Sequence, residues 1–369
     1  MRHFLAAAAL STLPLAALLS GQAPAPPPLK LAIAGLVHGH VSGFLRAAQG
    51  RTDVQIVGIF DPDKALHQDY AARFKLDPSV FYSDLGTMLD RSKPEAVASF
   101  TSTYDHPVVV EAAATRHIDV MMEKPLAVSM EHARRIERAA AAGGIDVLVN
   151  YETTWYPSHG AMWKLLKEQS AGGQIRKMVA MDGHRGPKEI NVQPEFLAWL
   201  TDPKLNGAGA LFDFGCYGAN LMTWMMDNER PLSVMAMTKQ FKPDIYARVD
   251  DEATILVEYA KAQGIIEASW NWPFDRKDFE VYAERALAVG SRTALRVRTG
   301  TEPEHVVTPE PLAAGEEDSI AHLMAVVRGT RKPNALSSLQ NNMIVTEILE
   351  GARESARTHA RVVLAKGGK

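Results

Sequence analysis

Short apolar runs alternate with helical patterns through the first half of the chain. Runs that fit buried strands fall at residues 31–35, 54–60, 96–100, 120–122 and 147–150. Stretches of helical character separate them, at residues 41–48, 64–74, 84–89, 108–116 and 130–142. Strands that alternate with helices are typical of a parallel, doubly wound sheet. We therefore predict that residues 29–150 form a Rossmann-like domain of the α/β class.

The pattern changes in the second half. After a predicted helix at residues 158–167, stretches of strand type follow at residues 176–183, 232–241, 254–259, 264–270, 278–283 and 293–298. Short turns between them favour an antiparallel sheet. A helix at residues 211–226 is expected to cover one face of this sheet, and a last helix at residues 339–355 to dock against one of the two domains. Residues 151–369 are thus predicted to form an α+β domain with an open, mainly antiparallel sheet.

The first 28 residues differ from the rest of the chain. Arg2 and His3 precede a nearly uncharged apolar run from Phe4 to Leu19, and a proline-rich tract follows it. The run is short for a membrane-spanning helix but suits the apolar core of a secretory signal. A buried segment or a membrane tether is the alternative. We predict residues 1–28 to be a Sec-type signal peptide and a stiff linker. The protein is then periplasmic or secreted, without a stable membrane span once the signal is removed.

Composition narrows the class of protein. The chain has 369 residues, of which 46% are hydrophobic and 22% charged, and this length suits about two globular domains. A formal net charge of −3 gives no reason to expect a nucleic acid or an anionic membrane as partner. The single cysteine, Cys216, excludes both an intrachain disulfide framework and a thiolate zinc site.

A charged pair follows the predicted strand at residues 120–122. Pro125 disfavours the α region for Lys124 and so holds that residue extended at the strand's end. In open parallel sheets, ligands bind at the carboxyl ends of the strands. Lys124 is therefore a candidate catalytic residue, and Glu123 and Lys124 are candidates for the wall of a cofactor crevice, although Glu-Lys-Pro is common by chance.

The first strand-to-helix turn reads Gly35-Leu36-Val37-His38-Gly39-His40. A complete dinucleotide fingerprint has glycine at its first, third and sixth positions, and only the first is glycine here. Gly39 is expected to let the backbone approach a pyrophosphate, and the helix start to offer amide donors. A tight turn without a ligand is the alternative. His38 and His40 have no third partner at a metal-ligand spacing, so no metal site is predicted.

Asp61 falls at the end of the second predicted strand. An acid in this place accepts hydrogen bonds from ribose hydroxyls and repels a 2′-phosphate, which favours NAD over NADP. A helix-capping role in Asp61-Pro62-Asp63 is the alternative. Thr101, Ser102 and His106 follow the strand at residues 96–100 and are expected to line the same crevice. A simple surface position is the alternative for His106.

In the second domain, Asp213 and Tyr217 lie four residues apart in the predicted helix at residues 211–226 and so share one face. A tyrosine phenol beside a lysine ammonium and a carboxylate makes a workable proton relay. The lysine stabilises the phenolate, and the carboxylate holds the lysine. A core tyrosine with a satisfied hydroxyl is the alternative.

Together these residues resemble the Gfo/Idh/MocA oxidoreductase family over about residues 30–365. The resemblance rests on the glycine turn, Glu123-Lys124-Pro125, the stretch from Gly209 to Tyr217, and Ala268-Ser269-Trp270. It implies a Rossmann domain joined to an α/β domain whose open sheet builds oligomer contacts, and hence a homo-oligomer. It also implies hydride transfer between a sugar or cyclitol carbon and NAD(H) or NADP(H).

The family's catalytic lysine and aspartate map to Lys124 and Asp213, and its last catalytic position, usually histidine, maps to Tyr217. The unperturbed pKa of tyrosine is about 10, against about 6.5 for histidine, so Lys124 would have to lower the pKa of Tyr217. Aromatic faces and fork-shaped donors suit a polyol. The residues expected to face the sugar are Tyr151, Trp155, Tyr156, His184, Arg185 and Trp270.

The leading hypothesis is an NAD(P)-dependent oxidoreductase that acts on a sugar or a sugar derivative. Free NAD is not expected outside the cytoplasm, so an exported enzyme would need a tightly bound cofactor that is recycled within each turnover. Two alternatives stay open. One is a redox glycoside hydrolase with a recycled bound NAD, and the other is a non-catalytic carbohydrate-binding protein that has kept the fold.

Overall fold

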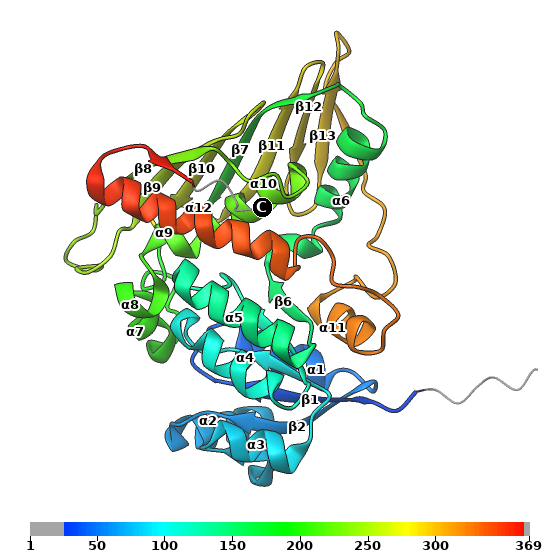
Figure 1. Ribbon diagram of the computed structural model, residues 1–369, viewed down its shortest axis with the longest axis vertical. Helices are drawn as coiled ribbons and strands as arrows, with labels where there is room; N and C mark the ends of the chain where they lie inside the picture. Colours follow the sequence, from blue (N-terminus) through cyan, green and yellow to red (C-terminus); the bar gives the residue numbers. More distant parts are fainter. Residues whose placement is uncertain (1–25, 365–369) are drawn as a thin grey trace, which may run out of the picture.

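The structure is a computed structural model and describes residues 26–364. The predicted signal peptide and linker, residues 1–28, lie outside the described residues except for residues 26–28. Figure 1 shows a smaller sheet domain, coloured blue to cyan, below a broad sheet coloured green to yellow. The red C-terminal helix, α12 (Leu339–Thr358), runs between the two parts.

The first domain is a six-stranded sheet in which all strand pairs are parallel, in the order β3-β2-β1-β4-β5-β6. Its strands are β1 (Leu29–Ala34), β2 (Val54–Phe60), β3 (Phe81–Tyr82), β4 (Ala96–Ser99), β5 (Asp119–Glu123) and β6 (Val147–Asn150). The Rossmann-like prediction is therefore confirmed. The two-residue strand β3 escaped prediction because two residues carry no periodicity.

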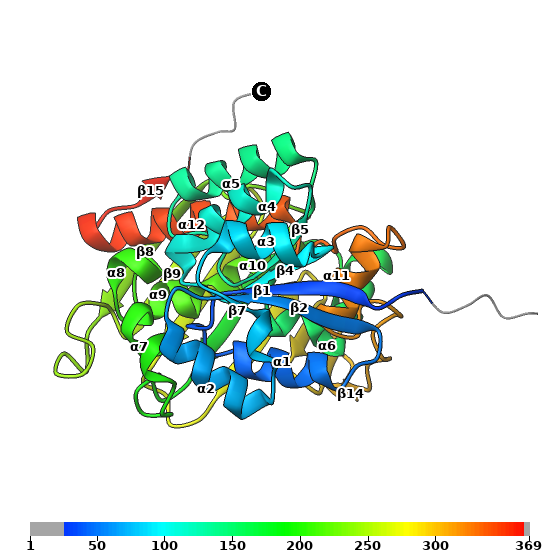
Figure 2. The same cartoon turned by 90° about the horizontal axis from the view of Figure 1, so that it is seen from below.

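Helices cover both faces of this sheet. They are α1 (Val41–Gln49), α2 (Lys64–Phe74), α3 (Leu85–Ser92), α4 (His106–Ala114) and α5 (Met130–Gly143). Figure 2 shows α1 and α2 on one face and α3, α4 and α5 on the other. The strand order reverses between β1 and β4, so the carboxyl ends of these strands open a crevice.

The second domain is a nine-stranded sheet in the order β14-β13-β12-β11-β7-β10-β9-β8-β15. Its strands are β7 (Ile175–Gly183), β8 (Ser233–Lys239), β9 (Glu252–Glu258), β10 (Gln263–Ser269), β11 (Arg276–Ala283), β12 (Ala286–Gly290), β13 (Leu295–Thr299), β14 (His305–Val307) and β15 (Val362–Val363). The pair β7–β10 is parallel and the other pairs are antiparallel. The prediction of a mainly antiparallel sheet is confirmed, while β12, β14 and β15 were not predicted.

The predicted single helix at residues 211–226 is wrong. The chain forms α9 (Ala210–Asp213) and α10 (Gly215–Met225), which meet at Phe214. In an unbroken helix the Asp213 carbonyl would accept from the Tyr217 amide. Instead, that amide donates to the Phe214 carbonyl at 3.1 Å, and the Asp213 carbonyl accepts from the Lys124 Nζ at 2.9 Å. The break therefore gives a backbone acceptor to a lysine of the other domain.

The other helices of the second domain are shorter or lie at its edges. They are α6 (Pro157–Trp163), which continues as a π-helical turn (Lys164–Glu168), α7 (Pro194–Leu200), α8 (Pro203–Asn206) and α11 (Ser319–Val327). Among the described residues, no helix is both long enough and apolar enough to cross a membrane.

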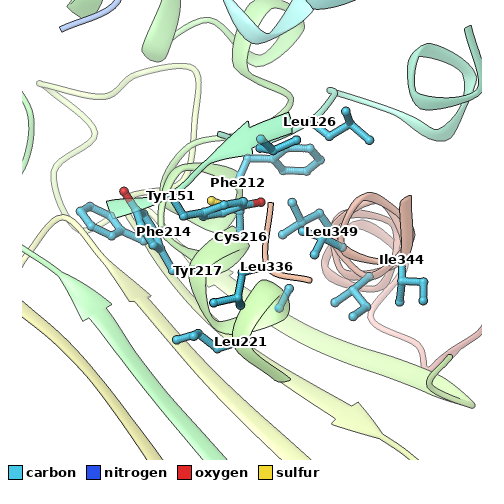
Figure 3. Close-up of a cluster of buried hydrophobic side chains, with 14 of the residues drawn as sticks. Leu126, Tyr151, Phe212, Phe214, Cys216, Tyr217, Leu221, Leu336, Ile344 and Leu349 are labelled. Carbon is cyan, nitrogen blue, oxygen red and sulfur yellow. The ribbon is translucent and has the colours of Figure 1, made fainter. Parts of the chain in front are cut away.

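One buried cluster runs through both domains. It includes Leu126 after β5, Phe212 on α9 and Leu349 on α12 (Figure 3). The hydroxyl of Tyr151, which follows β6, donates to Asn342 Oδ1 on α12 at 3.0 Å. The last helix therefore docks against both domains, where one was expected.

Gly209 sets the start of α9. Its amide donates to Asp250 Oδ1 at 2.8 Å, and the Leu211 amide donates to Asp250 Oδ2 at 2.7 Å. A Cβ on Gly209 would lie 1.8 Å from the Asp250 carbonyl oxygen. Since that neighbour is backbone, a side chain here would displace the loop that contains Asp250 and would move α9 with it.

We expect Gly209→Ala to lower the free energy of unfolding by about 3 kcal/mol, because the added methyl overlaps a backbone oxygen. Urea denaturation followed by circular dichroism measures this. The control is Gly43→Ala at an exposed position of α1, where a Cβ meets no atom within 4 Å. That variant should gain up to about 1 kcal/mol from helix propensity. Equal effects of the two substitutions would contradict the packing argument.

Candidate active site between the two domains

An ion pair between Lys124 and Asp213 joins the two domains. Lys124 follows β5 at the carboxyl edge of the first sheet, and Asp213 ends α9. The Lys124 Nζ donates to Asp213 Oδ1 at 2.5 Å, and the two side chains are only 6% and 7% exposed. The peptide bond to Pro125 is cis. A buried charge is unfavourable unless it is paired and hydrogen-bonded, so this contact fixes how the domains meet.

Burial and pairing act against each other in this ion pair. Burial lowers the pKa of Lys124, but the Asp213 carboxylate and other neighbours together outweigh that effect, and the pKa lies above its ordinary value. Burial raises the pKa of Asp213, but the Lys124 ammonium, His184 and Trp270 together outweigh that effect and hold the pKa below its ordinary value. Both groups are therefore charged at neutral pH, and Lys124 is a fixed cation.

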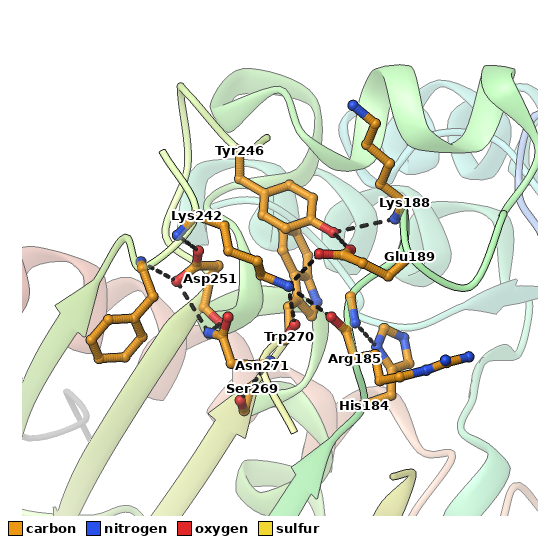
Figure 4. A network of polar contacts seen from close by, with 12 residues as sticks. His184, Arg185, Lys188, Glu189, Lys242, Tyr246, Asp251, Ser269, Trp270 and Asn271 are labelled. Atoms are coloured by element: carbon orange, nitrogen blue, oxygen red, sulfur yellow. Dashed lines mark hydrogen bonds and ion pairs between the residues drawn. The ribbon is translucent and has the colours of Figure 1, made fainter. Parts of the chain in front are cut away.

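Trp270 holds the second oxygen of Asp213. Its indole N–H donates to Asp213 Oδ2 at 2.9 Å, and its side chain is fully buried. Lys242 donates to the Trp270 carbonyl oxygen at 2.6 Å and to Glu189 at 2.5 Å (Figure 4). Tyr246 also donates to Glu189. The prediction that Trp270 faces a sugar is wrong, because the indole orients the Asp213 carboxylate instead.

Tyr217 lies beside the ion pair, with its ring toward the ammonium group. The Lys124 Nζ is 5.1 Å from the ring centre, and the Lys277 Nζ is 4.7 Å from it. Figure 3 shows Tyr217 next to Phe214 and Tyr151. Burial raises the pKa of Tyr217 well above its ordinary value. The expectation that Lys124 brings the pKa of Tyr217 below its ordinary value is wrong for this structure, because burial raises the pKa by more than the nearby ammonium can lower it.

A pocket of about 450 Å³ lies beside Phe214 and Lys277, and its lining does not include Lys124, Asp213 or Tyr217. Phe214 and His184 line it on one side, and Glu152, Tyr156 and Lys277 are also part of its wall. Its Asp, Glu, Lys and Arg side chains are three carboxylates and three cations, which are Glu152, Asp275, Asp278, Arg276, Lys277 and Arg292. With these charges balanced, the pocket suits a neutral, polar ligand.

Only some of the residues predicted to face a sugar line the pocket. Tyr156 and His184 line the pocket. The prediction for Tyr151 is wrong, because its side chain is fully buried and its hydroxyl is bonded to α12. Among the described residues, neither Trp155 nor Arg185 is part of the pocket lining. Trp155 donates to Asn150 Oδ1 at 2.9 Å, at the end of β6.

Sequence reasoning missed Glu152, Lys277 and Asp182. Lys277 on β11 faces Asp182 on β7 across the sheet, and its ammonium is paired with Glu152. Asp182 is 1% exposed, and burial raises its pKa well above the ordinary value. One signal could have found Lys277. It shares a strand face with the buried Phe279 two residues later, and a charge on an inward face is unusual.

The glycine turn has two close neighbours. Gly35 has φ of +91°, and a Cβ there would meet Thr101 Cγ2 at 2.7 Å. A Cβ on Gly39 would meet the Phe196 ring of α7 at 2.8 Å. The Trp199 indole N–H, also on α7, donates to the Val37 carbonyl at 3.1 Å. Packing against α7 thus accounts for Gly39, and its approach to a pyrophosphate stays a prediction.

His38, His40 and Glu123 form a cluster at the end of this turn. Their ligand atoms all lie within 4.8 Å of one another, which is a spacing that could hold a metal ion. The His40 Nδ1 lies 3.0 Å from Glu123 Oε2, and Asn150 donates to Glu123 Oε1 at 2.8 Å. Burial raises the pKa of Glu123, but its neighbours outweigh that and bring it to about 2. The hydrogen bonds account for this cluster without an ion, although Glu123 supplies the third partner that the sequence spacing did not reveal.

The remaining crevice residues are placed at the ends of β2 and β4. Asp61 is 1% exposed and accepts from the Leu36 amide at 2.8 Å and the Asp63 amide at 2.9 Å. The N-cap of α2 is Asp63, not Asp61. Contact of Asp61 with a ribose stays a prediction, since backbone amides already engage both of its oxygens.

Thr101, Ser102 and His106 are all buried, so a surface position for His106 is excluded. The Ser102 hydroxyl donates to Asp105 at 2.6 Å. The His106 Nδ1 lies 3.1 Å from the Leu126 carbonyl, next to the Lys124-Pro125 bond. Burial lowers the pKa of His106 to about 4, so the ring is neutral at neutral pH.

The fold and the site define a class of protein: a Rossmann domain and an open-sheet domain that enclose a lysine–aspartate pair. Two family models match this chain. The "Oxidoreductase family, NAD-binding Rossmann fold" matches residues 29–151, and the "GFO/IDH/MocA C-terminal domain" matches residues 161–289. Together they cover more than half of the sequence, and the chain belongs to the Gfo/Idh/MocA family.

Curated relatives share about a quarter of the aligned residues. The dTDP-3,4-didehydro-2,6-dideoxy-alpha-D-glucose 3-reductase of Streptomyces antibioticus is 26% identical over 52% of this chain and 55% of its own length. The trans-1,2-dihydrobenzene-1,2-diol dehydrogenase of Xenopus laevis is 28% identical over 44% of this chain and 47% of its own length. The chain thus spans about half the length of these two relatives. The D-apiose dehydrogenase of Paraburkholderia graminis is 25% identical over 84% of this chain and 83% of its own length.

Solved structures share the fold over nearly the whole chain. An inositol dehydrogenase homolog from Azotobacter vinelandii, complexed with NAD+, has a TM-score of 0.78 at 21% identity and covers 91% of this chain and 97% of its own. An aldose-aldose oxidoreductase from Caulobacter crescentus has a TM-score of 0.77 at 18% identity and covers 91% of this chain and 100% of its own.

Asp213→Ala leaves the buried Lys124 ammonium without its partner, and we expect it to lower the free energy of unfolding by about 3–5 kcal/mol. Adding Lys124→Met removes the orphaned charge, so the double variant should recover a large part of the loss. Urea denaturation at pH 7 gives the free energies of unfolding of the wild type, of Asp213→Ala and of the double variant. Arg357→Ala breaks the exposed pair with Glu354 and should leave stability nearly unchanged. A double variant that is no more stable than Asp213→Ala would contradict the coupling between the two charges.

Proposed function

We propose that this protein is an NAD-dependent oxidoreductase of a sugar or polyol, with Tyr217 as the proton-transfer group and Lys124 as the cation beside it. The observation that carries the proposal is the buried Lys124–Asp213 pair, set between the cofactor-type domain and a charge-balanced polar pocket. A binding protein gains little from such a pair, because burying two charges is unfavourable. Relatives named as sugar dehydrogenases and reductases support it.

The residues at the carboxyl edge of the first sheet fit a dinucleotide. The first turn of α1 has no side-chain cap at His40. The Val41 amide is bonded to the His38 carbonyl at 3.1 Å, so we propose that the amides after Val41 meet a pyrophosphate. The carboxylate of Asp61 ends β2, where it would disfavour a 2′-phosphate, so we propose NAD rather than NADP. When bound, the nicotinamide ring would accept a hydride from the sugar carbon or return one to it.

Each residue near the pocket then has one task. Tyr217, once it is the phenolate, takes the hydroxyl proton of the carbon that is oxidised and becomes the phenol. Lys124 keeps a positive charge beside the ring, which stabilises the phenolate that must be present before the transfer. Asp213 and Trp270 keep that ammonium in place through the contacts described above. Tyr156 supplies a pocket wall with a hydroxyl for sugar hydroxyl groups.

Export and cofactor retention belong to the same proposal. The apolar run at residues 4–19 supports a signal peptide and a periplasmic or secreted location. NAD would then have to be carried with the folded protein and recycled by alternate oxidation and reduction of two sugars.

The purified protein should release NAD(H) on denaturation, and chromatography of the supernatant distinguishes it from NADP(H). The native protein is then incubated with pairs of sugars and with aryl glycosides, without added cofactor. We expect oxidation of one sugar coupled to reduction of the other. Lys124→Ala should lose this turnover because the phenolate is left without its cation. The exposed Lys261→Met is the matched control.

Other outcomes separate the alternatives. Release of an aglycone without net NADH would favour a redox glycoside hydrolase. Formation of NADH that depends on added NAD would show a plain dehydrogenase. Absence of both cofactor and turnover, or normal turnover in Lys124→Ala, would contradict the proposed function.

We also propose a homo-oligomer that forms through the open face of the second sheet. Met235, Met237 and Leu256 are 45%, 62% and 38% exposed, and Met235 pairs with Leu256 across β8 and β9. Apolar side chains grouped on one open sheet face are typical of a protein interface. Met237→Lys should shift the protein toward monomer in sedimentation velocity, whereas Val108→Lys on α4 should not. A monomeric wild type would contradict the proposal.

A further inference from the structure

We propose that Lys277 is a second positioning cation for Tyr217 and that Glu152, its ion-pair partner, opposes it. The two together set the pH at which the phenol gives up its proton. This inference rests on the proposed function, because it concerns proton transfer by Tyr217. Lys277 acts through Tyr217 and is a positioning residue in this scheme.

Lys277 approaches the phenol from the second sheet. It lies on β11 two residues before the buried Phe279, so the two side chains point to the same inner face. The Lys277 Nζ is 4.7 Å from the centre of the Tyr217 ring, closer than the 5.1 Å of the Lys124 Nζ. A unit charge at about 5 Å in a partly buried site shifts a proton equilibrium on the order of tenfold or more.

Glu152 carries the opposing charge. It opens the 3-10 turn Glu152–Trp155 after β6, and its carboxylate accepts from the Lys277 ammonium and from the Tyr156 hydroxyl, the latter at 2.7 Å. Burial raises the pKa of Glu152, but Lys277 and the other donors outweigh that effect and hold it below its ordinary value. Glu152 is therefore ionised, and its charge helps to raise the pKa of Tyr217.

The other groups that face Tyr217 are either neutral or separately paired. They are Cys216 on α10, Asp213 on α9, Glu123 and Lys124 at the end of β5, and Tyr151 after β6. Burial raises the pKa of Cys216 and Tyr151, so these two are neutral at neutral pH. Asp182 on β7 lies opposite Lys277 in the sheet, and burial raises its pKa as well.

Among the ionised groups, Asp213 is bonded to Lys124, and Glu123 to His40 and Asn150. Glu152 and Lys277 differ from these pairs because both also line the pocket. Either one can be neutralised without breaking the contact between the domains.

The two charges predict opposite effects on the phenol. Lys277→Met keeps most of the aliphatic stem and leaves Glu152 unopposed, so the acid limb of kcat against pH should move up by about one unit. Glu152→Gln keeps the shape of the side chain and leaves Lys277 unopposed, so the same limb should move down by a similar amount. Lys277→Arg retains the charge and should keep the profile close to that of the wild type.

The experiment records kcat against pH for the holoenzyme at saturating sugar, with KM followed separately because both residues line the pocket. The exposed Lys261→Met and Glu302→Gln change charge in the same way away from the site and should leave the profile in place. Shifts in opposite directions would support the inference. A drop in kcat or a rise in KM without movement of the profile would overturn it, since a structural or purely substrate-binding role has that result.

The failure of the proposed function looks different. A wild-type protein that turns over no sugar would overturn the proposed function and this inference with it. Turnover in the wild type with an unmoved profile in both variants would overturn this inference alone.

Discussion

The Lys124 ammonium is buried, and much of the structure follows from the need to satisfy it. A buried charge must be paired and hydrogen-bonded. Its carboxylate partner, Asp213, comes from the other domain, and the break between α9 and α10 frees a carbonyl for it as well. Gly209 allows α9 to start against the loop that contains Asp250, and Trp270 donates to the second carboxylate oxygen of Asp213. The arrangement of the domains, the break between α9 and α10 and the need for glycine at position 209 therefore all depend on one ion pair.

The same burial makes Tyr217 a weak acid. A dry site favours a neutral phenol, and Lys124 is already bonded to its own carboxylate. Further charges near the ring then decide how readily the proton leaves, and these charges lie in the pocket wall. Under the proposed function, proton transfer and sugar binding would share residues, and the pocket that selects the sugar would also influence the reactivity of the base.

The incomplete glycine fingerprint has a structural explanation in α7. This second-domain helix covers the first turn of the Rossmann domain, with Phe196 beside Gly39 and Trp199 bonded to the Val37 carbonyl. The glycine at position 39 serves this contact between domains. A turn that must fit a neighbouring helix is under different constraints from one that contacts a dinucleotide alone, and Gly39 is a glycine of the first kind.

Local patterns determined most of the elements, the two-domain division and the candidate residue Lys124, because periodicity and strand ends are properties of neighbouring residues. Asp213 and Tyr217 were candidates chiefly through the resemblance to the family. The prediction of one helix at residues 211–226 failed because its break is stabilised by Lys124, which lies 89 positions away from Asp213 in sequence. Tyr151 and Trp270 read as ligand-facing aromatics, yet the structure buries both. Glu152 and Lys277 lie 125 positions apart in sequence and carry no shared motif. Only the tertiary structure brings these two charges to the Tyr217 phenol, because packing decides which side chains that are distant in sequence share a buried site.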